Sequence, residues 1–78
     1  MARLRLFGPA REAAGIAEAQ LPGRCVGDVV AAAVARFGPD FSQILKVSRI
    51  WVNGDDAEPG ALVNDNDEIA VIPPVSGG

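Results

Sequence analysis

The stretch VGDVVAAAVARF at residues 26–37 decides the fold, because its apolar side chains recur at helical spacing. They fall at i, i+3, i+4, i+7, i+8 and i+11, which places them on one face of an amphipathic helix. Gly38-Pro39 follows at once, with glycine at the cap and proline just beyond, as is typical of a helix end. We expect Val30 and Val34 at the centre of the core. The full apolar stripe is Val26, Val29, Val30, Ala33, Val34 and Phe37.

Short segments on both sides of this helix have the pattern of strands. Residues 3–7, RLRLF, alternate polar and apolar side chains, so Leu4 and Leu6 would face the core of a half-buried strand. Asn53-Gly54 is a strong signal for a tight turn after a strand. The order predicts an α+β domain of the form ββαββ, with one main helix on one face of a small mixed sheet. The other expected strands are 18–21, 50–52, 68–72 and a shorter one at 62–63.

The segments between these elements are expected to form short helices and turns. Residues 10–14 would make one helical turn, and Pro39 can open a second short helix that runs to about Leu45. Cys25 stands where Ser or Thr would cap the main helix, so we expect a weak cap. The acidic residues are interpreted as solvated turns, since the second group lacks the glycine and distal glutamate of a calcium loop. These residues are Asp55, Asp56 and Glu58, and the run 64–67.

The composition excludes several classes of protein. The 78 residues are 49% hydrophobic and 22% charged, which indicates one globular domain rather than a disordered chain. There is no histidine and only one cysteine, so neither a histidine metal motif nor an intramolecular disulfide is possible. A net charge of −3 argues against nucleic-acid binding. Without an apolar run near 18 residues or a signal-peptide pattern, we expect no membrane span and a cytoplasmic location.

The final residues 73–78, PPVSGG, have a different character. Pro73-Pro74 favours an extended conformation, and Gly77 and Gly78 have no side chain, so this end could enter a narrow tunnel in another protein. Its carboxylate would become reactive as an acyl-adenylate, from which sulfide or persulfide could displace AMP and leave a thiocarboxylate. The alternative is a frayed terminus without a function. We therefore divide the chain into a domain, residues 1–72, and a flexible tail, residues 73–78.

Three stretches together resemble the MoaD type of the MoaD/ThiS sulfur carriers, the small subunit of molybdopterin synthase. They are LFGPARE at residues 6–12, VNG at 52–54 and DEIAVIPPVSGG at 67–78. The resemblance implies a β-grasp, ubiquitin-like fold and a carrier without a catalytic role of its own. It implies that Gly78 bears the acyl-adenylate and then the thiocarboxylate, and that Gly77 fits the partner's tunnel. No permanently bound cofactor is implied, because the ATP is consumed by an activating enzyme.

The resemblance also implies two protein partners, an E1-like adenylating enzyme and the large catalytic subunit of molybdopterin synthase, expected as a heterotetramer. Strand parity suggests where they dock. Phe7, Trp51 and Ile72 would all face away from the helix on neighbouring strands, which predicts an exposed apolar patch beside the tail. The alternative is that loops cover Trp51. The tail residues Pro73, Pro74 and Val75 would extend this partner-binding surface.

Other functions remain open at this point. Carriers for thiazole or cysteine synthesis share the fold and the Gly-Gly end. A ubiquitin-like modifier would be conjugated to lysines through Gly78. A binding module with an incidental tail is the plainest reading. Cys25 could carry a persulfide, although a small buried residue at a helix start is the more ordinary role of such a cysteine.

Overall fold

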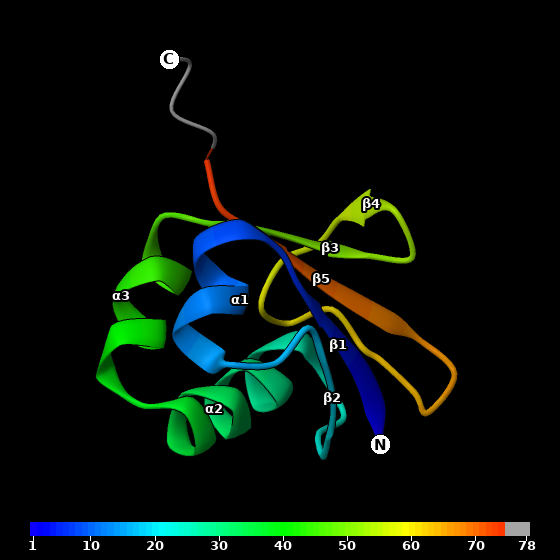
Figure 1. The fold of residues 1–78 in the computed structure, drawn as a ribbon. Helices are drawn as coiled ribbons and strands as arrows, with labels where there is room; N and C mark the ends of the chain where they lie inside the picture. The colour runs from blue at the N-terminus through cyan, green and yellow to red at the C-terminus, as the bar shows by residue number, and fades with distance from the viewer. Residues whose placement is uncertain (75–78) are drawn as a thin grey trace.

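A computed structural model describes residues 1–74, and in this part of the chain it shows a five-stranded sheet and three helices (Figure 1). Residues 75–78 lie outside the described part. In chain order, the elements are β1 (Ala2–Leu6), α1 (Gly8–Ala14), β2 (Glu18–Leu21), α2 (Val26–Phe37), α3 (Pro39–Lys46), β3 (Arg49–Val52), β4 (Asp55–Asp56) and β5 (Glu68–Ile72).

The sheet is mixed and has the strand order β2-β1-β5-β3-β4. β1 and β5 run parallel at its centre, whereas β2, β3 and β4 each pair antiparallel with their neighbours. The first, third and last strands are therefore adjacent, which confirms the predicted β-grasp arrangement. Because β1 and β5 are parallel, the end of β5 lies beside the start of α1, at the opposite end of the sheet from the N-terminus (Figure 1).

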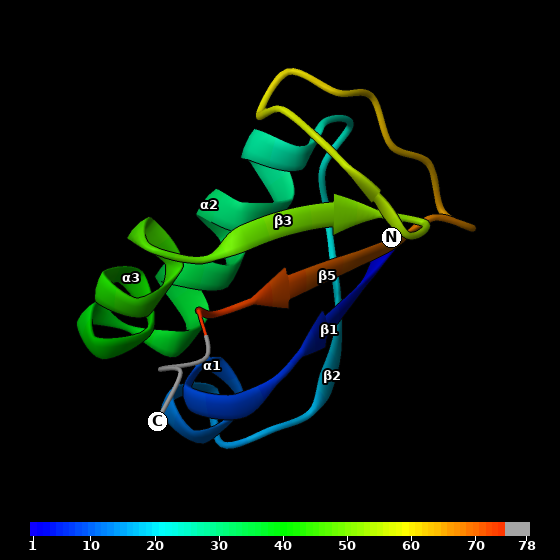
Figure 2. The same cartoon turned by 90° about the horizontal axis from the view of Figure 1, so that it is seen from above.

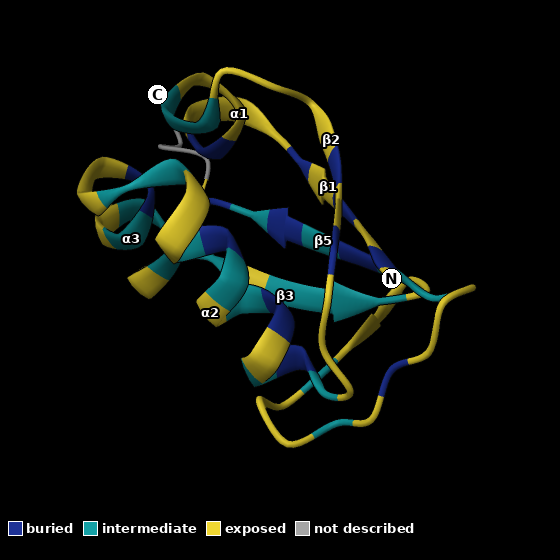
Figure 3. Cartoon of the chain, turned by 90° about the horizontal axis from the view of Figure 1, so that it is seen from below, coloured by how far each residue is buried: buried dark blue, intermediate teal, exposed yellow. Residues whose placement is uncertain are grey.

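The three helices lie on one side of the sheet, and the core fills the space between the two layers (Figure 2). Buried residues alternate with exposed or half-buried ones along β1, β2 and β5 (Figure 3). Leu4 and Leu6 face this core, as the alternation in residues 3–7 predicted. Phe41 of α3 is its largest fully buried side chain. The other fully buried residues with large side chains are Leu4, Ile69, Val29 and Val71.

The apolar stripe of α2 is in place, but its buried centre differs from the prediction. Val29 and Ala33 are completely buried, whereas Val30 and Val34 are only half-buried at the edge of the core. The apolar stripe is wider than the surface of α2 that contacts the sheet, because one flank of the helix packs on α3. There the rings of Phe37 and Phe41 meet edge to face, with centroids 5.2 Å apart.

Smaller differences concern the short segments. Asn53 and Gly54 both have positive φ, 52° and 90°, as a tight hairpin turn of this sequence requires. This turn makes Asp55 and Asp56 the strand β4, where a solvated turn was expected. The expected strand at 62–63 is only an isolated bridge between Leu62 and Cys25. α1 spans Gly8–Ala14 and is longer than the single expected turn.

No helix within residues 1–74 is long and apolar enough to cross a membrane.

Candidate functional site

The end of β5 is where the domain passes into the predicted tail. Ile72 pairs with Arg49 of β3, the following Pro73 is buried, and Pro74 is exposed. Because Pro73 is buried, it adds little exposed surface here, and its predicted part in partner binding stays a prediction. Val75, Gly77 and Gly78 lie outside the described residues, and their predicted roles stay predictions.

The outer face of the sheet, opposite the helices, lies directly beside this end of β5. One row of paired residues crosses all five strands: Glu18, Arg5, Ala70, Trp51 and Asp56. Its middle member, Ala70, is small and pairs with Arg5 on one side and Trp51 on the other. The next row toward the tail holds Ile72, and Phe7 lies beside it because the preceding Leu6 pairs with Val71.

The predicted apolar patch is present, but its members are exposed to different degrees. Phe7 is 42% exposed, which agrees with the prediction, whereas Trp51 and Ile72 are half-buried. The indole Nε1 of Trp51 is buried and has no hydrogen-bond partner in the described residues. Trp51 therefore exposes only part of its ring on this face. This result lies between the two expectations, a fully exposed side chain and one covered by loops. We call Phe7, Ala70, Trp51 and Ile72 the outer patch.

Charged side chains surround the outer patch in three ion pairs. Arg5 Nη1 lies 3.1 Å from Glu68 Oε1, and the Arg5 guanidinium carbon lies 5.7 Å from the centroid of the Phe7 ring. Sequence reasoning assigned Arg5 no role, although the strand parity that placed Phe7 outward also places Arg5 there. Exposed pairs contribute about 0–1 kcal/mol each, so they position charge more than they stabilise the fold. The other two pairs are Arg3–Glu18 at 3.7 Å and Arg49–Asp56 at 3.9 Å.

A second polar cluster fixes the far end of β5. The Asn53 side chain donates to Asp67 Oδ1 at 2.9 Å and accepts from the Glu68 N–H at 3.0 Å. The Asn64 N–H donates to Asp67 Oδ2 at 2.9 Å. These hydrogen bonds, first that of Asn53 and then that of Asn64, lower the pKa of Asp67. The cluster holds β3 and β5 in register, and thereby the patch residues on them.

The sequence offered two other candidates, Cys25 and a metal site formed by acidic residues. Cys25 is half-buried at the start of α2, and its side chain makes no capping hydrogen bond, as expected. It lies next to Leu62 rather than near the end of β5. In the described ranges, no group of three or more His, Cys, Asp or Glu side chains could hold a metal ion.

Comparisons with known proteins identify a matching family and several related proteins. Residues 4–78 match the ThiS family. A curated relative, the molybdopterin synthase sulfur carrier subunit of Dictyostelium discoideum, is 48% identical over 42 residues, which is 51% of this chain. The aligned segment is 49% of that relative, so the chain spans about half the length of the curated relative it matches.

Solved structures show the same fold over nearly the whole chain. The small archaeal modifier protein 1 (SAMP1) of Methanosarcina acetivorans has a TM-score of 0.88 and is 29% identical, covering 99% of this chain and 95% of that one. A complex of subunits 1 and 2 of the molybdopterin-converting factor of Helicobacter pylori contains a chain with a TM-score of 0.73 and 23% identity. That match covers 99% of this chain and 97% of that one. At 23% identity the second likeness concerns the fold alone.

Proposed function

This chain belongs to the ThiS family, of the MoaD/ThiS type of ubiquitin-like sulfur carriers, and we propose that it carries sulfur for the synthesis of molybdopterin. The observation that carries the proposal is the extent of the family match. It runs from residue 4 to residue 78 and so includes the Gly77-Gly78 end as well as the domain. The name of the Dictyostelium relative supports molybdopterin as the product.

The proposed chemistry takes place at the carboxylate of Gly78. One of its oxygens attacks the α-phosphate of ATP on an E1-like activating enzyme, and pyrophosphate leaves. A sulfide sulfur then attacks the acyl carbon of the adenylate, and AMP leaves with the bridging oxygen. If a persulfide attacks instead, the product is an acyl disulfide, and a second thiol must cleave its S–S bond to release the thiocarboxylate. The resulting thiocarboxylate gives its sulfur to the pterin precursor, and hydrolysis restores the carboxylate. In this scheme the chain binds no permanent cofactor and contributes no acid or base, while Gly77 lets the end fit a narrow tunnel.

The proposed docking surface for the large catalytic subunit is the outer patch together with Pro74 and Val75. Its position beside the end of β5 would place the tail toward the bound partner. An exposed apolar patch with charged surroundings is typical of an interface, because apolar burial supplies affinity and the charges supply orientation. The Dictyostelium relative is named a subunit of molybdopterin synthase, which supports a partner subunit here. We extend this to a heterotetramer in the cytoplasm.

A reconstituted synthase tests the product. The chain, charged with sulfur, is mixed with a large molybdopterin synthase subunit and the pterin precursor, and transfer of sulfur to the precursor is measured. We expect product from the intact chain and none from a chain that lacks Gly78. If the charged chain instead supports only a thiazole or cysteine synthase, the family assignment stands but the product is wrong.

A second candidate function is protein modification, and the likeness to SAMP1 favours it. Conjugation would join Gly78 to a lysine amine of another protein. Residues 50–78 contain no lysine or arginine, so trypsin would leave a long remnant on the target. Cleavage after glutamate leaves only residues 69–78 attached, and mass spectrometry of the host proteome can search for that remnant. Lysines that carry it would support this second function.

A further inference from the structure

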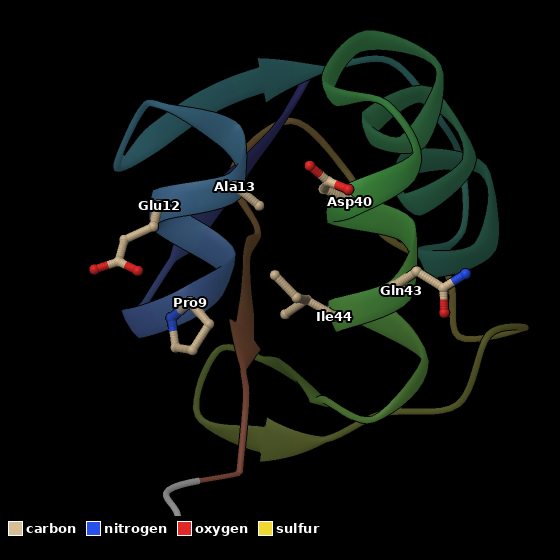
Figure 4. Close-up of a pocket in the computed structure, with 6 residues that line it drawn as sticks. All are labelled: Pro9, Glu12, Ala13, Asp40, Gln43 and Ile44. Carbon is tan, nitrogen blue, oxygen red and sulfur yellow. The ribbon is translucent and has the colours of Figure 1, made fainter.

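An open groove of about 500 Å³ lies between α1 and α3, on the helical side of the molecule (Figure 4). α1 contributes Pro9, Glu12 and Ala13, and α3 contributes Asp40, Gln43 and Ile44. Figure 4 shows Ile44 directed from α3 toward α1, so that the two helices share an apolar floor. This groove is separated from the outer patch by the sheet, so the two surfaces lie on opposite sides of the molecule.

The groove combines this apolar floor with negative charge. Its two ionisable residues, Glu12 and Asp40, are both exposed, and no cationic side chain lines it. Neither carboxylate lies within 4.0 Å of a cationic nitrogen in residues 1–74. The Asp40 carboxylate points into the gap between the helices, whereas Glu12 projects from the outer side of α1 (Figure 4). On the outer sheet face, by contrast, each arginine is matched by an acid.

The groove also adjoins the end of the domain from which the tail leaves. α1 begins directly after β1, whose last residue Leu6 pairs with Val71 of β5. α3 leads through Val47 and Ser48 into β3, whose first residue Arg49 pairs with Ile72. Both walls of the groove are therefore anchored next to the end of β5 (Figure 1). A protein that receives the tail would therefore approach the end of the molecule at which this groove opens.

We propose that the groove between α1 and α3 is a second docking site, which takes an aliphatic side chain flanked by lysine or arginine from a protein that receives the tail. The aliphatic group would pack on Ala13 and Ile44. One flanking cation would pair with Asp40, whose carboxylate points into the gap between the helices (Figure 4). The other would reach over α1 to Glu12 at the outer rim of the groove. The identity of the partner rests on the proposed function, whereas the chemistry of the ligand rests on the groove itself.

Peptide binding tests the chemistry of the groove without any enzyme. The full chain, labelled with ¹⁵N, is titrated with a blocked Gly-Arg-Leu-Arg-Gly peptide and, separately, with Gly-Glu-Leu-Glu-Gly. We expect amide shifts confined to residues 10–13 and 40–44 with the first peptide only, and weaker shifts at high salt. Changing Glu12→Gln together with Asp40→Asn should reduce the affinity about fivefold. Shifts that scatter over the surface, or that are equal for both peptides, would overturn the proposal.

Docking kinetics test the partner. The same double variant is compared with Asp55→Asn/Glu58→Gln, which removes equal charge from exposed positions outside the groove. With either the activating enzyme or the large subunit, the groove variant should raise KM or Kd for the chain while kcat and melting temperature stay unchanged. Equal effects of both double variants, or no effect with either partner, would refute the docking site. A wild-type chain that is never adenylated refutes the proposed function instead, and the peptide titration still decides the groove.

Discussion

Phe7 and Arg5 show what single residues contribute to the outer patch. Alternation along residues 3–7 was enough to predict that Phe7 faces outward, because each extended residue reverses direction, although β1 itself ends at Leu6. It did not predict that Arg5 would lie between the Phe7 ring and Glu68, since that contact depends on how β1 pairs with β5. The partial burial of Trp51 also lay beyond the sequence, because parity fixes the face of a side chain but not what covers it.

The first prediction concerns Phe7→Asp. Phe7 contributes little to the core, so the variant should melt within a few degrees of the parent chain, with the loss of a contact to Arg5 worth about 0.5–1 kcal/mol. Binding to the large subunit, measured by calorimetry, should weaken at least tenfold, since a carboxylate would replace the most exposed apolar member of the patch. Leu62→Asp is the matched control, because Leu62 is 82% exposed and lies away from the patch. Equal binding by all three chains would show that the patch is not the interface.

The second prediction concerns Asp67, whose pKa is lowered by the hydrogen bonds from Asn53 and Asn64. A carboxyl group with a lowered pKa in the folded state stabilises the fold above its unfolded value of about 3.9, and loses this effect as the pH falls through the lowered value. At neutral pH the Asp67→Asn variant should therefore have a lower melting temperature than the parent chain. In strong acid the two melting temperatures should become equal. Thermal unfolding at a series of pH values measures this. A difference in melting temperature that stays constant with pH would contradict a stabilising role for the charged Asp67 carboxylate.

At the scale of elements, the long periodic segments were predictable and the short ones were not. α2 and β5 have the predicted bounds, because a stripe of six apolar positions or a strand bounded by turn residues leaves few alternatives. β4 contains only two residues, and its pairing follows from the Asn53-Gly54 turn rather than from its own side chains, which read as a solvated turn. The centre of the α2 stripe was misplaced, because helical periodicity does not say which flank the sheet and α3 each cover.

The corrected position of α2 gives the third prediction. Val29→Asp would bury an unpaired carboxylate at a completely buried position, which costs several kcal/mol. Since small domains have only about 5–15 kcal/mol of stability, we expect this variant to be largely unfolded by circular dichroism. Val34→Asp, on the half-buried flank, should fold with a lowered melting temperature. If Val34→Asp unfolds the chain and Val29→Asp does not, the helix face has been misassigned.

At the scale of the whole molecule, the two faces of the sheet differ in their surroundings. The helices and the inner face of the sheet make the core, whereas the outer face carries the outer patch beside the end of β5. Sequence and resemblance together predicted the fold and the face of the sheet that carries the patch, since both follow from short motifs. They did not predict the groove between α1 and α3, which arises where two helices distant in the sequence pack side by side.

The central claim is that Gly78 carries the sulfur, and intact-mass measurement tests it most directly. The chain is incubated with ATP, a cognate activating enzyme and a sulfide source, then digested and weighed. We expect the C-terminal peptide to gain the mass difference between sulfur and oxygen, only when ATP is present, and expect a chain lacking Gly78 to gain nothing. An unmodified C-terminal peptide together with a mass gain on Cys25 would contradict the account.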